Sequence, residues 1–228
     1  MFFVRNGQAE RYHIIGLVTL LLLVNILMPR WVCTSFYWDY RAAIAQNQYQ
    51  GAALFGEFNA ILADYCIIEA DRLWEEGRWY AVPFVYRIIL ALQPAYISFW
   101  SLLGWYYAFN VSSYYAGTDK ERAAIEEGVA VLRHGLRIHY AAYNLYFNIA
   151  WIYYKKLHDY KRAAQYAEKA REYPHPFSVD RLAALAMFRS GDRAGAEKLW
   201  ESYLSTHPGN TAARTELEHV RAARGETR

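Results

Sequence analysis

The histidines are the side chains of this sequence best suited to metal binding or proton transfer, and their positions favour neither. His134 and His139 are five residues apart, so they would lie on different faces of one helix. Four further histidines lie near the ends of expected helices: His158, His175, His207 and His219. At helix ends a surface or capping role is more common than metal ligation. We therefore predict no metal centre.

The other residue types that could carry catalysis are isolated as well. Asp64, Glu69 and Asp71 form a small acidic set, which a solvated helix face explains. The two cysteines, Cys33 and Cys66, fit neither a disulfide framework nor a metal cluster. The sequence contains no H-E-x-x-H, C-x-x-C, C-x-x-C-H, Walker or G-x-S-x-G motif. We expect a protein that is not an enzyme, with no cofactor and no small-molecule substrate.

The composition indicates aromatic packing rather than charge as the main feature. Aromatic residues make up 18% of the 228 residues and hydrophobic residues 55%, so a large ring surface must be packed or bound. The formal net charge is only +3 and no run of five like charges occurs, which argues against nucleic acid as a partner. A chain of this length can form one or two domains with a sizeable core.

The N-terminal region contains a nearly continuous apolar run, Ile14–Met28. Counted from Tyr12 to Val32, with Arg30 reaching outward, it attains the roughly 20 residues that a bilayer span needs. We therefore predict a single transmembrane helix at the N-terminus. Its anchor residues, in the membrane or at its edge, are Ile14, Leu20, Leu21, Leu22, Leu23, Ile26 and Trp31.

The orientation of this helix is weakly specified, because arginines flank it on both sides. Arg5 and Arg11 precede the run, and Arg30 and Arg41 follow it, so the positive-inside count is nearly a tie. We expect the N-terminus inside and the rest of the chain outside the cytoplasm, in a periplasm where one exists. A cleaved signal peptide and a buried core helix remain alternatives.

The segment Ile97–Asn110 shows the helical pattern around which the rest of the chain can be interpreted. Residues at offsets of three, four and seven share one helix face, and here they are large, large, tiny and large: Trp100, Leu103, Gly104 and Tyr107. Gly104 would mark the closest approach to a second helix, because only a missing side chain lets two helix axes come so near.

This face resembles the first helix of a tetratricopeptide repeat (TPR), whose signature is W-x2-L-G-x2-Y, then A-x3-F, then P. Similar landmarks recur in three other segments: about Ala63–Tyr96, Tyr143–Pro176 and Phe177–Asn210. The second repeat departs from the family by about twelve extra residues, Val111–Arg122, which we expect to extend the turn between its helices.

The second helices of two repeats carry the family's small residues at the expected spacing. In the second repeat the small-large-small pattern consists of Gly128, Leu132 and Gly135. In the third repeat the corresponding residues are Ala163, Ala167 and Ala170. Small residues at these positions allow close helix packing.

The resemblance implies an all-α fold: a right-handed α-solenoid of about four TPR-like helix pairs. We expect a tail and transmembrane helix in residues 1–33, a connector and N-terminal capping helix in 34–62, the repeats in 63–210, and a C-terminal capping helix and tail in 211–228. An ordinary helical bundle would show the same periodicity. A second membrane helix over the uncharged segment Ile88–Phe109 is disfavoured, because Pro94 interrupts it.

In TPR proteins the first helices line a concave face, so the resemblance also implies a protein-binding groove. Its residues here would be Asp64, Ile67, Asp71, Trp74, Trp105, Phe109, Asn144, Phe147, Trp151, Tyr154, Arg181 and Arg189. The groove would be acidic at one end, aromatic in the middle and basic at the other, and could hold a helix or an extended segment. The alternative is that its rings simply pack on one another or on the inserted segment.

The function that this resemblance implies is that of a non-catalytic, membrane-anchored scaffold. We expect a structural subunit of a larger membrane-associated complex, which binds other protein subunits through the groove and the lipid bilayer through the N-terminal helix. A transient assembly factor, for instance an accessory of secretion or of a pilus, is the first alternative. An enzyme or cofactor carrier, and a soluble repeat protein with a removed leader, are further alternatives.

Overall fold

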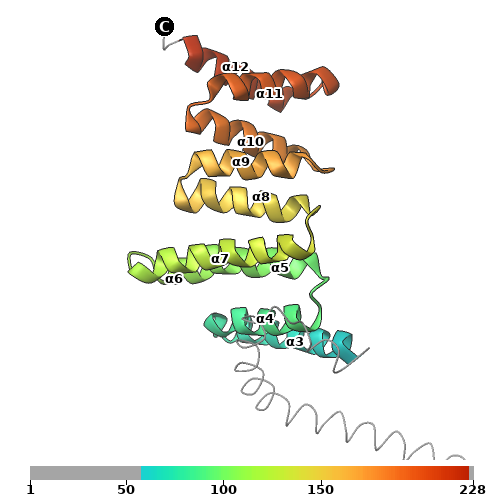
Figure 1. Cartoon of the computed structure of the whole chain (residues 1–228). Coiled ribbons are helices and arrows are strands. Elements are labelled where there is room, and N and C mark those ends of the chain that lie inside the picture. The colour runs from blue at the N-terminus through green and yellow to red at the C-terminus, as the bar shows by residue number, and fades with distance from the viewer. Residues whose placement is uncertain (1–57, 226–228) are drawn as a thin grey trace, which may run out of the picture. The chain divides into compact units, whose positions relative to one another are not determined.

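The computed structural model describes residues 58–225, and every regular element among them is a helix (Figure 1). The α-helices and the short 3-10 and π segments (η) follow in this order: α3 (Phe58–Glu75), η1 (Trp79–Ala81), α4 (Val82–Leu92), α5 (Ile97–Trp105), η2 (Tyr106–Val111), α6 (Ser112–Tyr114), α7 (Asp119–Ile138), α8 (Tyr143–Ile152), η3 (Tyr153–Leu157), α9 (Tyr160–Arg171), α10 (Phe177–Ser190), α11 (Arg193–Thr206) and α12 (Thr211–Gly225). The prediction of an all-α fold is confirmed for this part of the chain.

The predicted anchor, Ile14–Met28, and most of the predicted connector lie outside the described residues. Within residues 58–225, none of the helices combines the length and the apolar character that a membrane crossing requires. In particular, the uncharged segment Ile88–Phe109 is divided, because α4 ends at Leu92 and α5 begins only at Ile97.

The described helices form four successive pairs, and one further helix follows them (Figure 1). The first helices of the pairs are α3, α5 with its continuation η2–α6, α8 with its continuation η3, and α10; the second helices are α4, α7, α9 and α11. Each helix from α4 onward packs mainly against its neighbours along the chain. Successive helix pairs of the predicted kind are therefore present in the described residues.

Three glycines lie at the crossing between α5–η2 and α7, as the sequence predicts: Gly104 on α5, and Gly128 and Gly135 on α7. A Cβ atom added at Gly128 would lie 2.5 Å from the carbonyl oxygen of Gly104 and 3.1 Å from the Cβ of Ala108. A Cβ atom at Gly135 would lie 2.9 Å from the Cβ of Trp100. The two backbones can approach this closely only because both helices lack side chains at the crossing.

The prediction for the inserted residues Val111–Arg122 is wrong. They do not extend the turn: η2 and α6 continue the first helix to Tyr114, and α7 begins at Asp119. Ser112 is fully buried, and its hydroxyl donates a hydrogen bond of 2.6 Å to the carbonyl of Ala108, one turn earlier. The insertion therefore lengthens both helices of the second pair and leaves only a short connection between them.

Hydrophobic side chains form three clusters along the row of pairs. The first joins α3 and α4 to Tyr106 of η2, the second lies mainly within the second and third pairs, and the third joins α8 to α12. In the third pair the predicted small residues Ala163, Ala167 and Ala170 have no exposed surface. Close packing of these alanines brings α9 against both α8 and α10.

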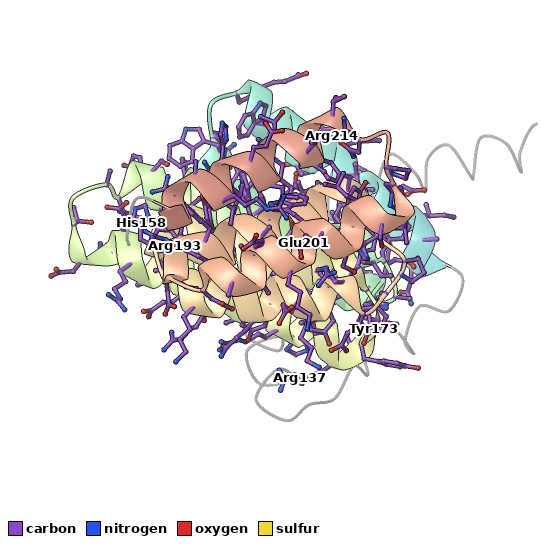
Figure 2. All side chains as sticks on the ribbon, turned by 90° about the horizontal axis from the view of Figure 1, so that it is seen from above. Arg137, His158, Tyr173, Arg193, Glu201 and Arg214 are labelled. Carbon is purple, nitrogen blue, oxygen red and sulfur yellow. The ribbon has the colours of Figure 1, made fainter. Side chains whose placement is uncertain are left out.

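The last helix, α12, covers α11 with one apolar face. Ala213, Leu217 and Val220 are buried in the third cluster beside Trp200. Polar contacts add to this packing. The guanidinium of Arg193, which is labelled in Figure 2, donates to the carbonyl of Ala223 at 3.0 Å. The guanidinium of Arg221 donates to the carboxylates of Glu197 and Glu201 at 3.0 and 2.5 Å. The opposite side of α12 is exposed and charged.

One turn carries local backbone strain. His158, labelled in Figure 2, ends η3 with φ of 52°, whereas the other positive φ values among the described residues belong to glycines, including Gly191. This conformation costs a residue with a Cβ atom about 1 kcal/mol. We expect His158→Gly to raise the free energy of unfolding by about 0.5 kcal/mol, measured by urea denaturation. Gly191→Ala should lower it, and a destabilised His158→Gly variant would contradict the interpretation.

Candidate functional site

The predicted groove residues all reach the surface of the described region. We call this set the first-helix face: Asp64, Ile67, Asp71, Trp74, Trp105, Phe109, Asn144, Phe147, Trp151, Tyr154, Arg181 and Arg189. Each is exposed or partly exposed, and none belongs to the buried core. They come from α3, from α5 and η2, from α8 and η3, and from α10. Their accessibility is compatible with binding, and their role stays a prediction.

Direct contacts join the face between the second and third pairs. The side-chain amide of Asn144 lies 3.4 Å from the hydroxyl of Ser101, which links α8 to α5. The ammonium group of Lys156 lies 5.4 Å from the ring centre of Phe109, which links η3 to η2. The aromatic residues of these two first helices therefore belong to one continuous surface.

The rings on this surface are stacked yet still accessible. Trp105 stacks on Phe109 with ring centres 4.8 Å apart, and 43% of Trp105 is exposed. Trp151 lies 6.2 Å from both Phe147 and Tyr154, in nearly parallel arrangement. Phe147, Trp151 and Tyr154 also pack against the third hydrophobic cluster, which joins α8 to α12. Packing of the rings on one another, the alternative to binding, thus accounts for part of their surface and leaves the rest open.

Both π segments contribute to the first-helix face. Phe109 belongs to η2, and Tyr154 belongs to η3 together with Lys155 and Lys156. A π turn adds one residue to a helical turn, so it rotates the side chains that follow relative to an unbroken α-helix. Lys155 is thereby placed over two rings, 5.1 Å from the centre of Trp151 and 5.8 Å from that of Tyr154. The sequence pattern did not reveal these turns.

The two ends of the face differ in charge. On α3, Asp64 and Asp71 are exposed beside Trp74, which is 53% exposed and meets Tyr106 edge-on at 5.9 Å. On α10, Arg181 forms an ion pair of 3.1 Å with Glu216 of α12, while Arg189 is exposed. The pairing of Arg181 could not be inferred from the sequence, because it depends on where α12 packs.

Partly buried polar contacts hold η2 against its neighbours. The hydroxyl of Tyr106 donates to the carbonyl of Trp79 at 2.9 Å, and burial raises the pKa of Tyr106 to about 12. Arg87 of α4 contacts both Tyr107 and Glu127. Burial alone disfavours the Arg87 cation, but these two partners outweigh it and raise its pKa. The segment that carries Phe109 is therefore held by the first pair and by α7.

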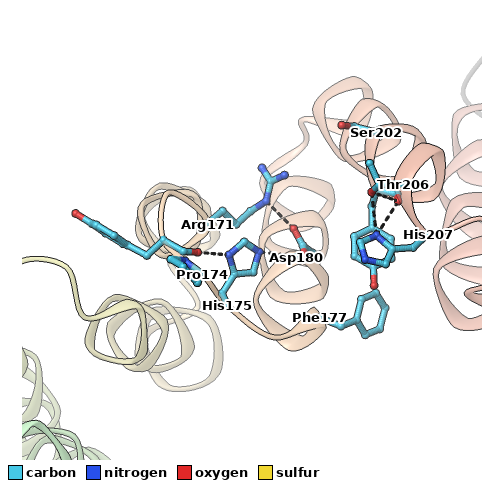
Figure 3. A pocket seen from close by; sticks show the side chains of 10 residues that line it. Arg171, Pro174, His175, Phe177, Asp180, Ser202, Thr206 and His207 are labelled. Carbon is cyan, nitrogen blue, oxygen red and sulfur yellow. Dashed lines mark hydrogen bonds and ion pairs between the residues drawn. The ribbon is translucent and has the colours of Figure 1, made fainter.

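A cavity of about 430 Å³ lies outside the first-helix face, between the α9–α10 connection and α11 (Figure 3). Its polar side is formed by Asp180, whose carboxylate accepts from Arg171 at 2.8 Å and lies 3.2 Å from His175. Phe177 and Tyr203 form the aromatic side. Both carboxylate oxygens of Asp180 are engaged, one by Arg171 and one by His175, so the cluster joins the α9–α10 connection to α10. Sequence reasoning placed His175 only at a helix end and missed the cluster.

No group of three or more histidine, cysteine, aspartate or glutamate residues within 58–225 is arranged to hold a metal ion.

No family model and no curated protein matches the sequence. Several solved structures resemble it, including the following two. A TPR protein from Thermus thermophilus is 14% identical over 79% of this chain and 94% of its own, with a TM-score of 0.53. PilF from Pseudomonas aeruginosa is 16% identical over 75% of this chain and 72% of its own, with a TM-score of 0.52. At these identities the similarity establishes the fold alone, and that fold is TPR-like.

Proposed function

We propose that this chain is a non-catalytic scaffold that binds other proteins through the first-helix face. The observation that carries the proposal is the continuous aromatic surface of the second and third pairs. Trp105 stays 43% exposed while it stacks on Phe109, and Lys156 joins Phe109 to η3. Tryptophan and tyrosine are the residues that most often dominate protein interfaces, because they bury a large area.

The packing beneath this surface supports a binding role. Phe147, Trp151 and Tyr154 rest on the third hydrophobic cluster, and Phe109 rests on the second. Rings that are already held in place lose little conformational entropy when a partner covers them. A preformed surface of this kind suits a lasting interface between subunits. A role as a structural subunit of a larger complex follows as the preferred form of the proposal.

We further propose that the N-terminal run Ile14–Met28 tethers the chain to a membrane, with the repeats on the extracytoplasmic side. The support is the apolar character of the run and the length of roughly 20 residues that it attains when counted from Tyr12 to Val32. A tether of this kind confines the first-helix face to one membrane surface and raises its effective concentration toward partners there. Partners would accordingly be other membrane-associated proteins.

Purification of the tagged chain from the membrane fraction of its own cells, after crosslinking, tests the proposal. We expect a protein partner at a fixed ratio, and at least a tenfold loss of it in the double variant Trp105→Ala/Trp151→Ala. Tyr140→Ala, which removes a ring that is 74% exposed outside the face, is the matched control and should change nothing. Thermal unfolding checks that the double variant remains folded.

Other outcomes of this experiment would change the conclusion. Equal recovery of the partner by the double variant would show that the first-helix face is not the binding surface. A partner recovered well below a fixed ratio would favour the transient assembly factor over the structural subunit. Absence of the chain from the membrane fraction would contradict the tether.

A further inference from the structure

The first helices of the four pairs differ sharply in charge along the chain. Between its bounds α3 carries four carboxylates and one arginine: Asp64, Glu69, Asp71, Glu75 and Arg72. The first helix of the second pair, residues 97–114, carries no charged residue. In the third and fourth pairs the charged residues of the first helices are Lys155, Lys156, Asp180, Arg181 and Arg189. The sign of the charge thus reverses across a neutral, aromatic middle.

Several of the charges at the two ends are not cancelled within the described residues. On α3 the only arginine, Arg72, is bonded to Glu69 and Glu76, and Asp64 and Asp71 form no ion pair in residues 58–225. At the other end, the first helices of the third and fourth pairs carry one carboxylate, that of Asp180, which is 6% exposed and already paired with Arg171. Arg181 is paired with Glu216 of α12 and adds no uncancelled charge.

The basic end keeps three cations that have no carboxylate partner in the described part of the chain: Lys155, Lys156 and Arg189. Lys155 and Lys156 contact rings instead, and cations over rings remain available to an anion on their outer side. Uncancelled charges of opposite sign at the two ends of a surface orient a partner, because the reversed placement brings like charges together.

We propose that the partner of the first-helix face is a protein segment that is basic at one end, apolar or aromatic in the middle and acidic at the other end, an arrangement that we call its charge order. Its basic side chains lie over Asp64 and Asp71, apolar or aromatic side chains lie over the stack of Trp105 and Phe109, and its carboxylates lie over Lys155, Lys156 and Arg189. This inference rests on the proposed binding function and adds the chemistry and the direction of the bound segment. Surface ion pairs are individually weak, so the charge order acts through several pairs together, which fix the direction of the segment and add moderately to its affinity.

Two synthetic peptides of identical composition test the charge order. The block peptide has lysines at one end, tryptophan and leucine in the middle and glutamates at the other end; the mixed peptide has the same middle with lysine and glutamate alternating at both ends. Binding to the full chain in detergent is measured by fluorescence anisotropy. We expect the block peptide to bind at least tenfold more tightly, and the difference to shrink when salt is raised to about 1 M, where the Debye length is about 3 Å.

Photocrosslinkers at the two ends of the block peptide test its direction. The basic end should react within residues 58–75 and the acidic end within residues 143–157 or 177–190. Asp64→Lys/Asp71→Lys should weaken the block peptide about tenfold, and adding Lys155→Glu/Lys156→Glu should restore its affinity with the crosslinks exchanged. The matched control, Asp119→Lys/Glu218→Lys, reverses two exposed carboxylates on α7 and α12 and should leave affinity unchanged.

The inference and the proposed function can fail separately. If the block peptide binds no more tightly than the mixed peptide, whether both bind or neither does, the charge order is wrong. The same conclusion follows if the crosslinks stay in place when all four charges are reversed. If the cellular partner is nevertheless recovered and lost on Trp105→Ala/Trp151→Ala, the scaffold function stands without the charge order.

Discussion

Adding one methyl group at Gly128 is expected to lower the free energy of unfolding by about 3 kcal/mol, the upper part of the range for overpacked cores. The new Cβ atom would lie 2.5 Å from the carbonyl oxygen of Gly104 and 3.1 Å from the backbone nitrogen of Ala108. These are backbone atoms of the facing helix, so no side-chain rotation relieves the clash. Urea denaturation of Gly128→Ala, followed by circular dichroism, measures the effect.

Helix propensity favours alanine at position 128, but this gain is smaller than the cost of the steric clash. Alanine is favoured over glycine inside a helix by about 1 kcal/mol, which Gly128→Ala would gain if the crossing could widen. It cannot widen without loss, because Leu132 and Leu103 beside it are 0% and 1% exposed. Gly209→Ala is the matched control, since its Cβ atom would meet nothing within 4 Å. Equal stability of the two variants would show that α5 and α7 are not held at this distance.

The crossing at Gly104 could be predicted because it depends on side-chain size and spacing within one helix. The same local signals located the helix pairs, since the 3.6-residue period is visible wherever one helix face is buried. The continuation of the first helix through Val111–Tyr114 was not visible. Ser112 and Ser113 are common in turns, and here their hydroxyls donate to carbonyls one turn earlier, at 2.6 and 2.5 Å. The sequence does not distinguish these two uses of serine.

For the candidate site, too, some features could be predicted from the sequence and others could not. That Trp105 and Trp151 lie off the core face follows from periodicity, and the structure places both at least partly at the surface. The contact of Lys156 with Phe109 and the ion pair of Arg181 with Glu216 join residues 47 and 35 positions apart. Such contacts depend on how separate helices pack and on the π turn η3, and no local pattern encodes either. The charge order of the first helices, in contrast, can be read from the sequence once the helix bounds are known.

Removing the carboxylate of Asp180 is the second large effect that the structure predicts. Asp180 is 6% exposed and accepts from Arg171 at 2.8 Å across the α9–α10 connection, with His175 at 3.2 Å. Loss of one partner from a buried ion pair costs about 3–5 kcal/mol, and the side chain of Arg171, 30% exposed, regains some hydration. We therefore expect Asp180→Ala to lower the free energy of unfolding by about 2–3 kcal/mol, measured by urea denaturation.

The control for this prediction uses the second carboxylate that reaches Arg171. Glu168 lies 3.6 Å from the guanidinium on the same helix and is 52% exposed, so Glu168→Ala should cost less than about 0.5 kcal/mol. In a double-mutant cycle, Asp180→Ala should lower the free energy of unfolding by less in the Arg171→Met background than in the unaltered chain, because no unpaired cation is left behind. Amide exchange should rise in the connection, residues 172–176, in Asp180→Ala and not in Glu168→Ala. Equal costs for both carboxylates would mean that the third and fourth pairs are joined by hydrophobic packing alone, with the buried pair contributing nothing to their connection.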